Sequence, residues 1–293
     1  MIEVRLLSHS FGSQLVLSNI NLTVPDGTIM GIVGINGAGK STLLRLLSGV
    51  YETNGQVLYD GRSPMDASTR QDIFFLPDDP YYSSSSTPKK LFEFYEAFYN
   101  SIDKEAFYRY ISLYKINPKQ NMRNFSKGMR RQVFIALALA IKPKYILLDE
   151  AFDGLDPLSR KIFKDAIVEL VEENNLTVLI SSHSLRELED FCDRFILIDN
   201  NVIKSQGDIA EHVERLCKFE IAFTTPITES DFSNLPVVSL EIKGRFVTIV
   251  LEGDKREMQK RLELLAPAVL DEMPLDFEEV FIHDVQTKRG ELK

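Results

Sequence analysis

The chain has 293 residues, of which 44% are hydrophobic and 26% charged, and this composition is ordinary for a globular protein. Its length predicts one large and one small domain. Its net charge of −9 argues against a broad nucleic-acid-binding surface, and its two cysteines are too few for a disulfide scaffold or a zinc site. The two unpatterned cysteines indicate a protein of the reducing cytoplasm. Because no apolar run approaches the roughly 18 residues of a membrane-spanning helix, we expect the chain to reach a membrane only through other chains.

The first 27 residues alternate apolar and polar side chains in short runs, which predicts antiparallel strands joined by turns at 11–13 and 25–27. Phe11 begins the first of these turns. Its ring can stack on a nucleotide base through the π-face, or it can simply close the edge of the sheet. Phe11 by itself leaves both interpretations open.

A glycine-rich loop with the sequence GINGAGKST occupies residues 34–42, between an apolar stretch at 28–33 and an apolar helix that begins at Leu43. This is the Walker A pattern in the strand, loop and helix setting that it requires, rather than a plain connecting turn. Glycines let backbone amides point inward around oxyanions, and the helix N-terminus adds positive charge there. We expect Lys40 to reach the β- and γ-phosphates of a nucleotide and the Ser41 hydroxyl to hold Mg²⁺. The residues expected around the phosphates are Gly34, Asn36, Gly37, Ala38, Gly39, Lys40, Ser41 and Thr42.

A polar loop and a helical segment come next. Residues 73–76 form a short apolar strand stopped by Pro77, and residues 78–87 form an exposed loop suited to contacting another molecule. From about residue 85 to 142 we expect a helical subdomain, in which aromatic side chains recur at helical spacing. These aromatic side chains either pack the subdomain or form a groove for the helix of a partner.

A buried strand predicted at residues 144–148 leads into Asp149 and Glu150, which is the Walker B pattern. Asp149 would support Mg²⁺ directly or through water, and Glu150 would polarise the attacking water as general base. Alone, two acids after a strand are as often a helix cap. Together with the Walker A loop they predict a site that hydrolyses a nucleoside triphosphate.

Three further positions belong to this pattern. Ser126 stands where a helix N-cap belongs, Asp156 lies in a turn before a helix, and His183 ends a β-branched strand. A lone histidine is more often structural than catalytic. Since the strand before His183 belongs to the same expected sheet, we expect His183 at the edge where the phosphates lie.

A second unit is expected from residue 216 to 293, after a large domain at 1–215. It shows strand patterns at 219–223, 237–242 and 246–251, a helix at 257–265 and a last strand at 278–282, followed by a mobile tail at 288–293. No phosphate loop or nucleophile pattern occurs in it. We therefore expect an accessory α+β domain for dimer contact or regulation.

The order of the Walker A loop, the Ser126 loop, the Walker B strand, the Asp156 turn and the His183 strand resembles the nucleotide-binding subunit of ABC transporters, in particular bacterial exporter-type members with a short C-terminal extension. The resemblance covers about residues 1–215. It implies an α/β P-loop NTPase fold of the ABC type, with a mixed core sheet, an N-terminal antiparallel β subdomain and an inserted helical subdomain. The cofactors that it implies are ATP and Mg²⁺.

The resemblance also implies roles for single residues. Phe11 would stack on adenine, Ser126 and Gly128 match the signature loop, Asp156 matches the D-loop, and His183 matches the H-loop and would contact the γ-phosphate. The catalytic residues would be Glu150, His183 and Lys40.

The sequence departs from the family's pattern at two places. Phe125, Lys127 and Met129 differ from the commonest signature form, and Asp78 stands where the family's Q-loop has glutamine. A carboxylate near Mg²⁺ could coordinate the ion more strongly than an amide would. Asp78 is therefore a candidate Mg²⁺ ligand with an open role, which Asp79 could share.

The family's arrangement predicts two subunits packed head to tail, with each ATP between one chain's Walker A loop and the other chain's signature loop. The expected partners are one or more separate transmembrane permease subunits, together with either a second copy of the chain or a similar ATPase subunit. The expected location is the cytoplasmic face of the membrane, and no nucleic-acid partner is expected. The alternatives are a soluble ABC-type ATPase acting on ribosomes or DNA, and a nucleotide-sensing regulator without turnover. Two features favour the transporter. The chain has a single cassette, and the roughly 80 residues between the Walker A loop and the signature loop are too few for a long coiled coil.

Overall fold

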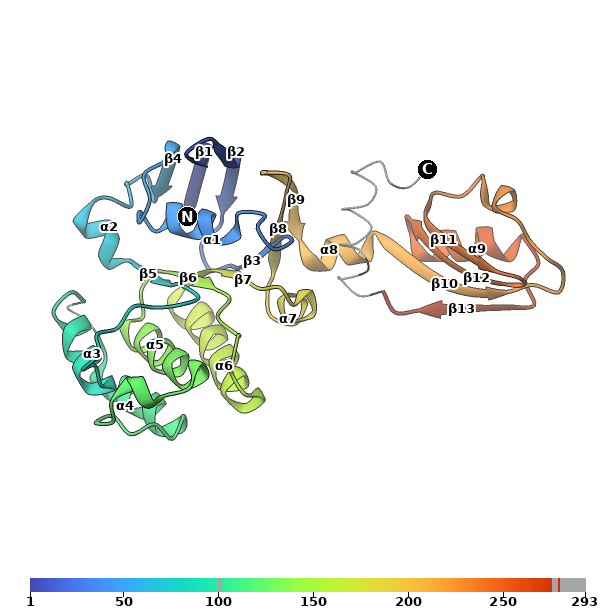
Figure 1. Ribbon diagram of the computed structural model, residues 1–293. Helices are drawn as coiled ribbons and strands as arrows, with labels where there is room; N and C mark the ends of the chain where they lie inside the picture. Colours follow the sequence, from blue (N-terminus) through green and yellow to red (C-terminus); the bar gives the residue numbers. More distant parts are fainter. Residues whose placement is uncertain (100–101, 276–278, 280–293) are drawn as a thin grey trace. The chain divides into compact units, whose positions relative to one another are not determined.

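The computed structural model describes residues 1–99, 102–275 and 279, and it divides into two compact units, Met1–Gln206 and Gly207–Lys293. The first unit contains the Walker motifs, and the second contains the separate sheet of the C-terminal part (Figure 1). Within the described residues, no helix combines the length and the apolar character needed to cross a membrane.

The core of the first unit is a six-stranded sheet in the order β5-β6-β7-β3-β8-β9. The five strands from β5 to β8 run parallel, and every residue of β3, β6 and β7 is buried, which explains their continuous apolar sequences. The strand bounds are Ile29–Val33 (β3), Ile73–Leu76 (β5), Tyr145–Asp149 (β6), Thr177–Ser181 (β7), Arg194–Asp199 (β8) and Val202–Asp208 (β9).

A second, antiparallel sheet covers one side of this core. Its order is β2-β1-β4, with β1 at Ile2–Phe11, β2 at Gln14–Val24 and β4 at Asn54–Tyr59. Helix α1 (Lys40–Leu47) lies between the two sheets (Figure 1), and its buried leucines share one apolar cluster with both of them. The predicted N-terminal antiparallel strands are confirmed, as is the strand, loop and helix setting of the Walker A sequence.

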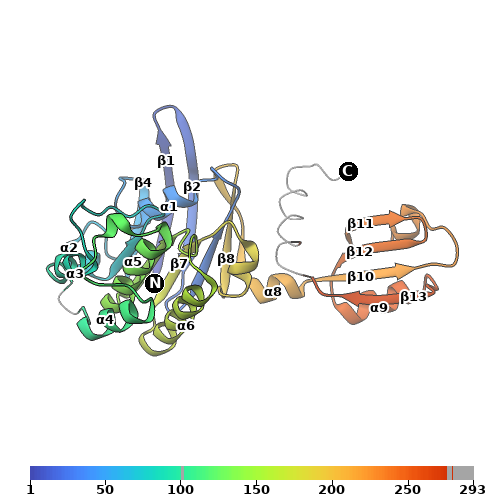
Figure 2. The same ribbon diagram turned by 60° about the horizontal axis from the view of Figure 1, so that its bottom comes forward.

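Helices cover the opposite face of the core sheet, where α4, α5 and α6 lie side by side (Figure 2). Helix α5 is almost entirely buried, in agreement with its long apolar run. Helix α6, with 18 residues, is longer than α5, and α3 is capped by Thr87 with Pro88 in its first turn. The helix bounds are Ala67–Gln71 (α2), Pro88–Glu96 (α3), Lys104–Leu113 (α4), Met122–Asn124 (η1), Lys127–Ile141 (α5), Pro157–Asn174 (α6) and Leu185–Glu189 (α7).

The aromatic side chains of the helical part fall into a buried group and an exposed group. Phe92 and Phe107 are buried with their ring centroids 4.9 Å apart, and Tyr99 donates a hydrogen bond of 2.9 Å to the carbonyl of Ile73. Phe94 and Phe98, in contrast, are 59% and 57% exposed. The structure thus contains both packed aromatic residues and exposed ones on the same segment.

The second unit is an antiparallel four-stranded sheet in the order β11-β12-β10-β13, with helix α9 packed on one face through Met258 and Leu262. The sequence did not predict β13, and the strand predicted at 278–282 and the tail at 288–293 lie outside the described residues, Glu279 apart. The element bounds are Ile209–Glu214 (α8), Leu216–Ala222 (β10), Glu229–Phe232 (η2), Val237–Lys243 (β11), Phe246–Glu252 (β12), Lys255–Glu263 (α9) and Val269–Met273 (β13).

Candidate functional site

A cavity of about 310 Å³ opens over the glycine-rich loop at the C-terminal edge of the parallel sheet. It brings together residues from three separate parts of the chain, at 11–16, 36–42 and 150, including Glu150 of the Walker B pattern and the turn aromatic Phe11. Gln14 and Val16, which sequence reasoning did not select, line it from strand β2 next to Phe11. The lining residues are Phe11, Gln14, Val16, Asn36, Gly37, Ala38, Gly39, Lys40, Ser41, Thr42 and Glu150.

The loop has the backbone geometry of an anion-binding nest. Gly37 and Gly39 have φ angles of 82° and 106°, in the left-handed region that side chains with a Cβ rarely adopt. Helix α1 begins directly after Gly39 and has no acidic residue in its first turn. The positive N-terminal end of the helix therefore faces the loop with no carboxylate from its own first turn.

Lys40 is nearly buried, at 6% exposure, and its Nζ donates to the backbone carbonyl of Gly34 at 2.7 Å. Burial lowers the pKa of Lys40, while the negative charges of Glu150 and Asp149 act in the opposite direction. The ammonium group is thus held against the loop by a neutral carbonyl that an anionic phosphate can replace.

The buried carboxylate of Asp149, at the end of β6, lies beside Ser41 of the glycine-rich loop. Its Oδ1 accepts hydrogen bonds of 2.9 Å from both Ser41 Oγ and Ser181 Oγ, and the side chain is 1% exposed. Its Oδ2 is buried and has no hydrogen-bond partner among the described residues. A buried carboxylate oxygen without a donor, next to a serine hydroxyl, fits the all-oxygen ligand preference of Mg²⁺.

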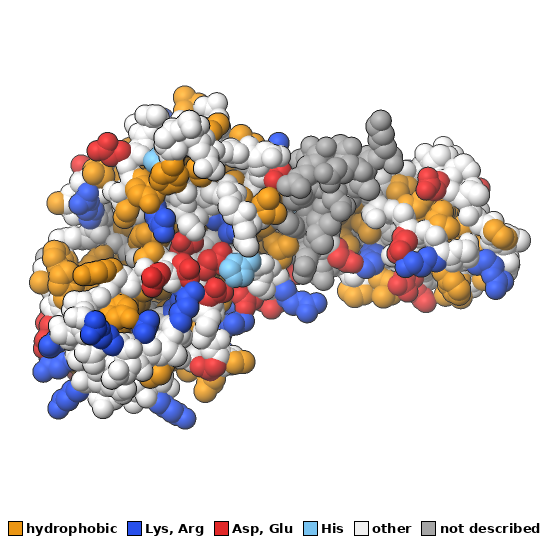
Figure 3. Space-filling view, viewed as in Figure 1, with side chains coloured by type: hydrophobic (Ala, Val, Ile, Leu, Met, Phe, Trp, Pro, Cys, Tyr) orange, Lys and Arg blue, Asp and Glu red, His pale blue; other side chains and the backbone are white. Residues whose placement is uncertain are grey.

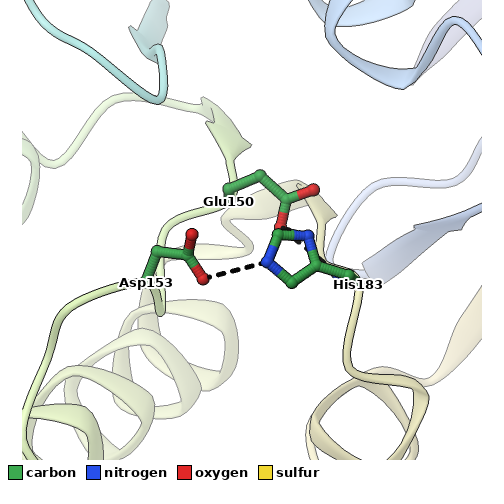
Figure 4. Close-up of side chains that lie close together, drawn as sticks. All are labelled: Glu150, Asp153 and His183. Carbon is green, nitrogen blue, oxygen red and sulfur yellow. Dashed lines mark hydrogen bonds and ion pairs between the residues drawn. The ribbon is translucent and has the colours of Figure 1, made fainter. Parts of the chain in front are cut away.

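Glu150, His183 and Asp153 meet in a chain of polar contacts (Figure 4), and Glu150 also lines the cavity. His183 Nδ1 lies 3.1 Å from Glu150 Oε2, and His183 Nε2 lies 3.3 Å from Asp153 Oδ1. The backbone N–H of His183 also donates to Glu150 Oε2 at 3.2 Å. The histidine expected at this edge is therefore in direct contact with the predicted base, while Asp153 was not foreseen, although it lies in the turn before Asp156.

Burial raises the pKa of Glu150, and the negative charges of Asp153 and Asp149 raise it further, against the opposing effects of His183 and Lys40. A raised pKa makes a carboxylate a better proton acceptor, which suits a general base.

The signature residues lie at the start of α5. Ser126 is exposed and caps this helix, with its Oγ accepting a 3.1 Å hydrogen bond from the Met129 N–H. Asp156 caps α6 by accepting from the N–H groups of Leu158 and Ser159 at 3.1 and 3.0 Å. Within the described residues, Ser126 and Asp156 thus act as helix caps of their own chain. Neither of them lines the cavity.

Gly128 is packed so closely against the turn at 153–156 that a Cβ there would overlap the carbonyl oxygen of Gly154. Alanine normally stabilises a helix by about 1 kcal/mol relative to glycine. Because the neighbour is backbone and cannot rotate away, we expect Gly128→Ala to destabilise the fold by about 1–3 kcal/mol instead. Urea unfolding would measure this. Gly31→Ala, whose nearest contact is Cys192 Sγ at 3.3 Å, should cost less, and equal costs would contradict the close-approach argument.

Asp78 lies two residues beyond β5, and within the described part of the chain its side chain accepts hydrogen bonds from Lys127 and Arg131, not from Ser41. Burial by itself would raise the pKa of Asp78, but hydrogen bonds from these two cations lower it. A role of Asp78 as a Mg²⁺ ligand stays a prediction.

Comparison with known proteins identifies the family of the chain. The family model described as ABC transporter matches residues 17–153. The ABC transporter ATP-binding protein YtrB of Bacillus subtilis (strain 168) is 32% identical over 293 residues, which cover 99% of each chain. The lantibiotic transport ATP-binding protein SrtF of Streptococcus pyogenes is 29% identical over 237 residues, 76% of this chain and 98% of SrtF.

A solved structure of the ATP-binding subunit of an ABC transporter superposes with a TM-score of 0.67 at 26% identity, covering 72% of this chain and 91% of that chain. The predicted α/β P-loop fold and the predicted ATPase function are confirmed. This chain therefore belongs to the ATP-binding subunits of ABC transporters, which are the ATPases of those systems.

Proposed function

We propose that the chain powers an ABC exporter as a head-to-tail dimer, bound to separate membrane-spanning subunits and using Mg²⁺ with ATP. The observation that carries the proposal is the cavity in which the glycine-rich loop, Lys40 and Glu150 converge. Export is supported by the resemblance of the single cassette with a short C-terminal extension to exporter-type members. The similarity to a lantibiotic transport protein supports transport over work on ribosomes or DNA.

Within one chain, the loop amides and Lys40 would bind the β- and γ-phosphates, with Lys40 Nζ exchanging the carbonyl of Gly34 for a phosphate oxygen. Ser41 and the free Oδ2 of Asp149 would hold Mg²⁺, which supplies charge neutralisation at the phosphates. Asn36, Gly37, Ala38, Gly39 and Thr42 would complete the phosphate cradle.

Glu150 would accept the proton of the attacking water, since its pKa is raised and its side chain faces the cavity. His183 holds one oxygen of this carboxylate through Nδ1 and its own backbone N–H, so that the other oxygen is left for the water. His183 would then act on the γ-phosphate when the nucleotide is present.

A second subunit is proposed because the cavity lacks the signature loop. The described residues that line it include none from 126 to 128, and Ser126 is exposed at the start of α5. In a head-to-tail dimer, the N-terminus of α5 of one copy, with Ser126 and Gly128, would close over the ATP of the other copy. Asp156 would lie at the interface between the two copies. The partner copy can be this chain or a similar ATPase.

The adenine is expected to stack on Phe11, whose ring is 48% exposed and is supported by His9 and Tyr51 at centroid distances of 4.8 and 5.7 Å. Stacking of a base on an aromatic ring is worth about 1–3 kcal/mol. We expect Phe11→Ala to weaken ATP binding by about 5- to 20-fold, and Phe11→Tyr to retain it, in a nucleotide titration. Phe246→Ala, at a 66% exposed phenylalanine of the second unit, is the control; equal effects would contradict stacking.

A groove of about 500 Å³ between α2 and α3 is the proposed contact for a helix of a membrane-spanning subunit. Hydrophobic side chains gather on this face of the molecule (Figure 3), and the exposed rings of Phe94 and Phe98 lie in the groove. Large exposed apolar side chains in a groove are typical of a protein-protein contact.

The test of the transport role is membrane attachment. Replacing Phe94 and Phe98 together by glutamate should remove the chain from the membrane fraction of its native cells while the ATPase activity of the purified protein stays within about twofold. Phe246→Glu should leave attachment unchanged. Attachment that survives the double replacement would exclude the groove as the contact. A chain that sediments with ribosomes and never with membranes would contradict the transporter proposal.

The domain division proposed from the sequence, 1–215 and 216–293, falls between α8 and β10 of the structure. We propose that the C-terminal domain serves dimer contact or regulation.

Among the described residues, the one group of acids and histidine close enough to share a cation is Glu150, Asp153 and His183, which is in the first unit.

A further inference from the structure

The two places where the sequence departs from the family's pattern meet in the structure. Lys127 Nζ donates to Asp78 Oδ1 at 2.8 Å, across 49 positions of the sequence. Lys127 is the residue after the signature serine, and Asp78 stands at the Q-loop position. One of the signature departures, Lys127, therefore forms an ion pair with the Q-loop departure, Asp78.

Arg131 joins the same carboxylate from one turn further along α5, where position i+4 lies on the same face as Lys127. Its Nη2 donates to Asp78 Oδ1 at 2.7 Å and to the Asp78 backbone carbonyl at 2.6 Å. Arg131 is 1% exposed, whereas Asp78 and Lys127 are 46% and 56% exposed. Arg131 Nε and Nη1 have no hydrogen-bond partner within the described residues.

A buried guanidinium without a counter-charge is strongly unfavourable. Among the described residues, Asp78 is the carboxylate that Arg131 contacts, so the negative charge at position 78 compensates a buried positive one. A neutral glutamine, the family's residue at this position, would supply a hydrogen-bond acceptor but no charge. This gives a physical reason for the aspartate that is independent of any metal ion.

The position of Asp78 links two parts of the site. It follows β5, whose residue Leu76 pairs with Leu148 of β6 immediately before Asp149. Lys127 follows Ser126, whose side chain caps α5. The ion pairs thus connect the sheet edge that holds the nucleotide of one chain to the serine that is presented to the other chain.

We propose that Asp78, Lys127 and Arg131 form a charged clamp that positions Ser126 of one subunit over the nucleotide bound by its partner. The proposal rests on the head-to-tail dimer proposed above. In it, Asp78 is a positioning residue, and a shift of the Q-loop is transmitted to the signature loop through two ion pairs.

The test is a double-mutant cycle on the purified full-length chain with Asp78→Asn, Lys127→Met and the pair together. We expect each single variant to lower kcat by about fivefold or more, and the double variant to fall no further than the worse single one, because the residues act as one unit. Asp78→Glu, which keeps the charge, should retain most of the turnover, whereas Asp78→Gln should not. The affinity of the single chain for ATP and the Mg²⁺ concentration that gives half-maximal activity should not change.

Lys161→Met is the matched control, since Lys161 forms an exposed i,i+4 ion pair with Asp165 on α6. Lys127→Met removes only the exposed partner of the clamp, so it remains informative if Asp78→Asn fails to fold around Arg131. A raised Mg²⁺ requirement in Asp78→Asn, with no effect of Lys127→Met, would overturn the clamp in favour of a metal ligand. Effects that multiply, or single variants with unchanged kcat, would overturn it as well.

These outcomes are separable from a failure of the proposed function. If Lys40→Ala and Glu150→Gln abolish turnover while the clamp variants do not change it, only the clamp is wrong. If none of the variants changes turnover, the assignment of the nucleotide site itself is wrong.

Discussion

Glu150→Gln is expected to bind ATP as well as the unchanged chain does and to lower its turnover by about 10²- to 10⁴-fold, the usual contribution of a positioned general base. Glutamine has nearly the shape of glutamate but cannot accept the proton of the attacking water. It also removes a negative charge that lies close to the expected γ-phosphate, beside Lys40. ATP should therefore stay unhydrolysed between two copies of the chain.

Two measurements check this expectation together. Phosphate release should fall, and size-exclusion chromatography in saturating Mg-ATP should show a dimer that disappears when the nucleotide is removed. Glu172→Gln, at an exposed position of α6, is the matched control and should behave like the unchanged chain. Turnover within about threefold of normal would exclude Glu150 as the base. A purely monomeric Glu150→Gln protein at saturating Mg-ATP would contradict the head-to-tail dimer.

Lys40→Ala should have an effect of similar size, but on binding as well as on turnover. A hydrogen bond to a charged group contributes about 1.5–3 kcal/mol, so we expect ATP affinity to fall by about 10- to 150-fold. Turnover should fall further, because charge builds up on the γ-phosphate oxygens in the transition state. The fold should survive, since the partners that Lys40 loses are backbone carbonyls of Gly34 and Ile35 rather than a buried carboxylate.

A nucleotide titration and a phosphate-release assay would measure both parts, with a thermal melt to show that the variant is folded. Lys161→Ala, which removes an exposed ammonium on α6, should change neither quantity. If Lys40→Ala left both affinity and turnover intact, the phosphate site would have to be sought elsewhere in the molecule.

The sequence alone predicted the local parts of the site, because each depends on a few consecutive residues. The glycines at 37 and 39 lie in the left-handed region that the loop requires. The apolar runs before the loop and before Asp149 are the fully buried strands β3 and β6. Ser126 caps a helix, as expected from its position before a helical segment.

The tertiary structure decided which of these parts meet. The strand order places β7 between β6 and β3, and this brings His183 to Glu150 and leaves Asp153 on the other side of the imidazole ring. Periodicity does not give strand order, because the neighbours in a parallel sheet are joined through long connections. The pairing of Asp78 with Lys127 was equally beyond local reasoning, because one residue follows a strand and the other begins a helix far along the chain.

What the sequence by itself determined, then, is the phosphate-binding loop, the acids after β6 and the family to which these belong, because backbone conformation and burial follow from neighbouring residues. What only the tertiary structure decided is the set of charge partners: His183 for Glu150, and Lys127 with Arg131 for Asp78. A side chain acquires a charged neighbour through packing, and the free energy of a buried charge depends on that neighbour rather than on the residues beside it in sequence.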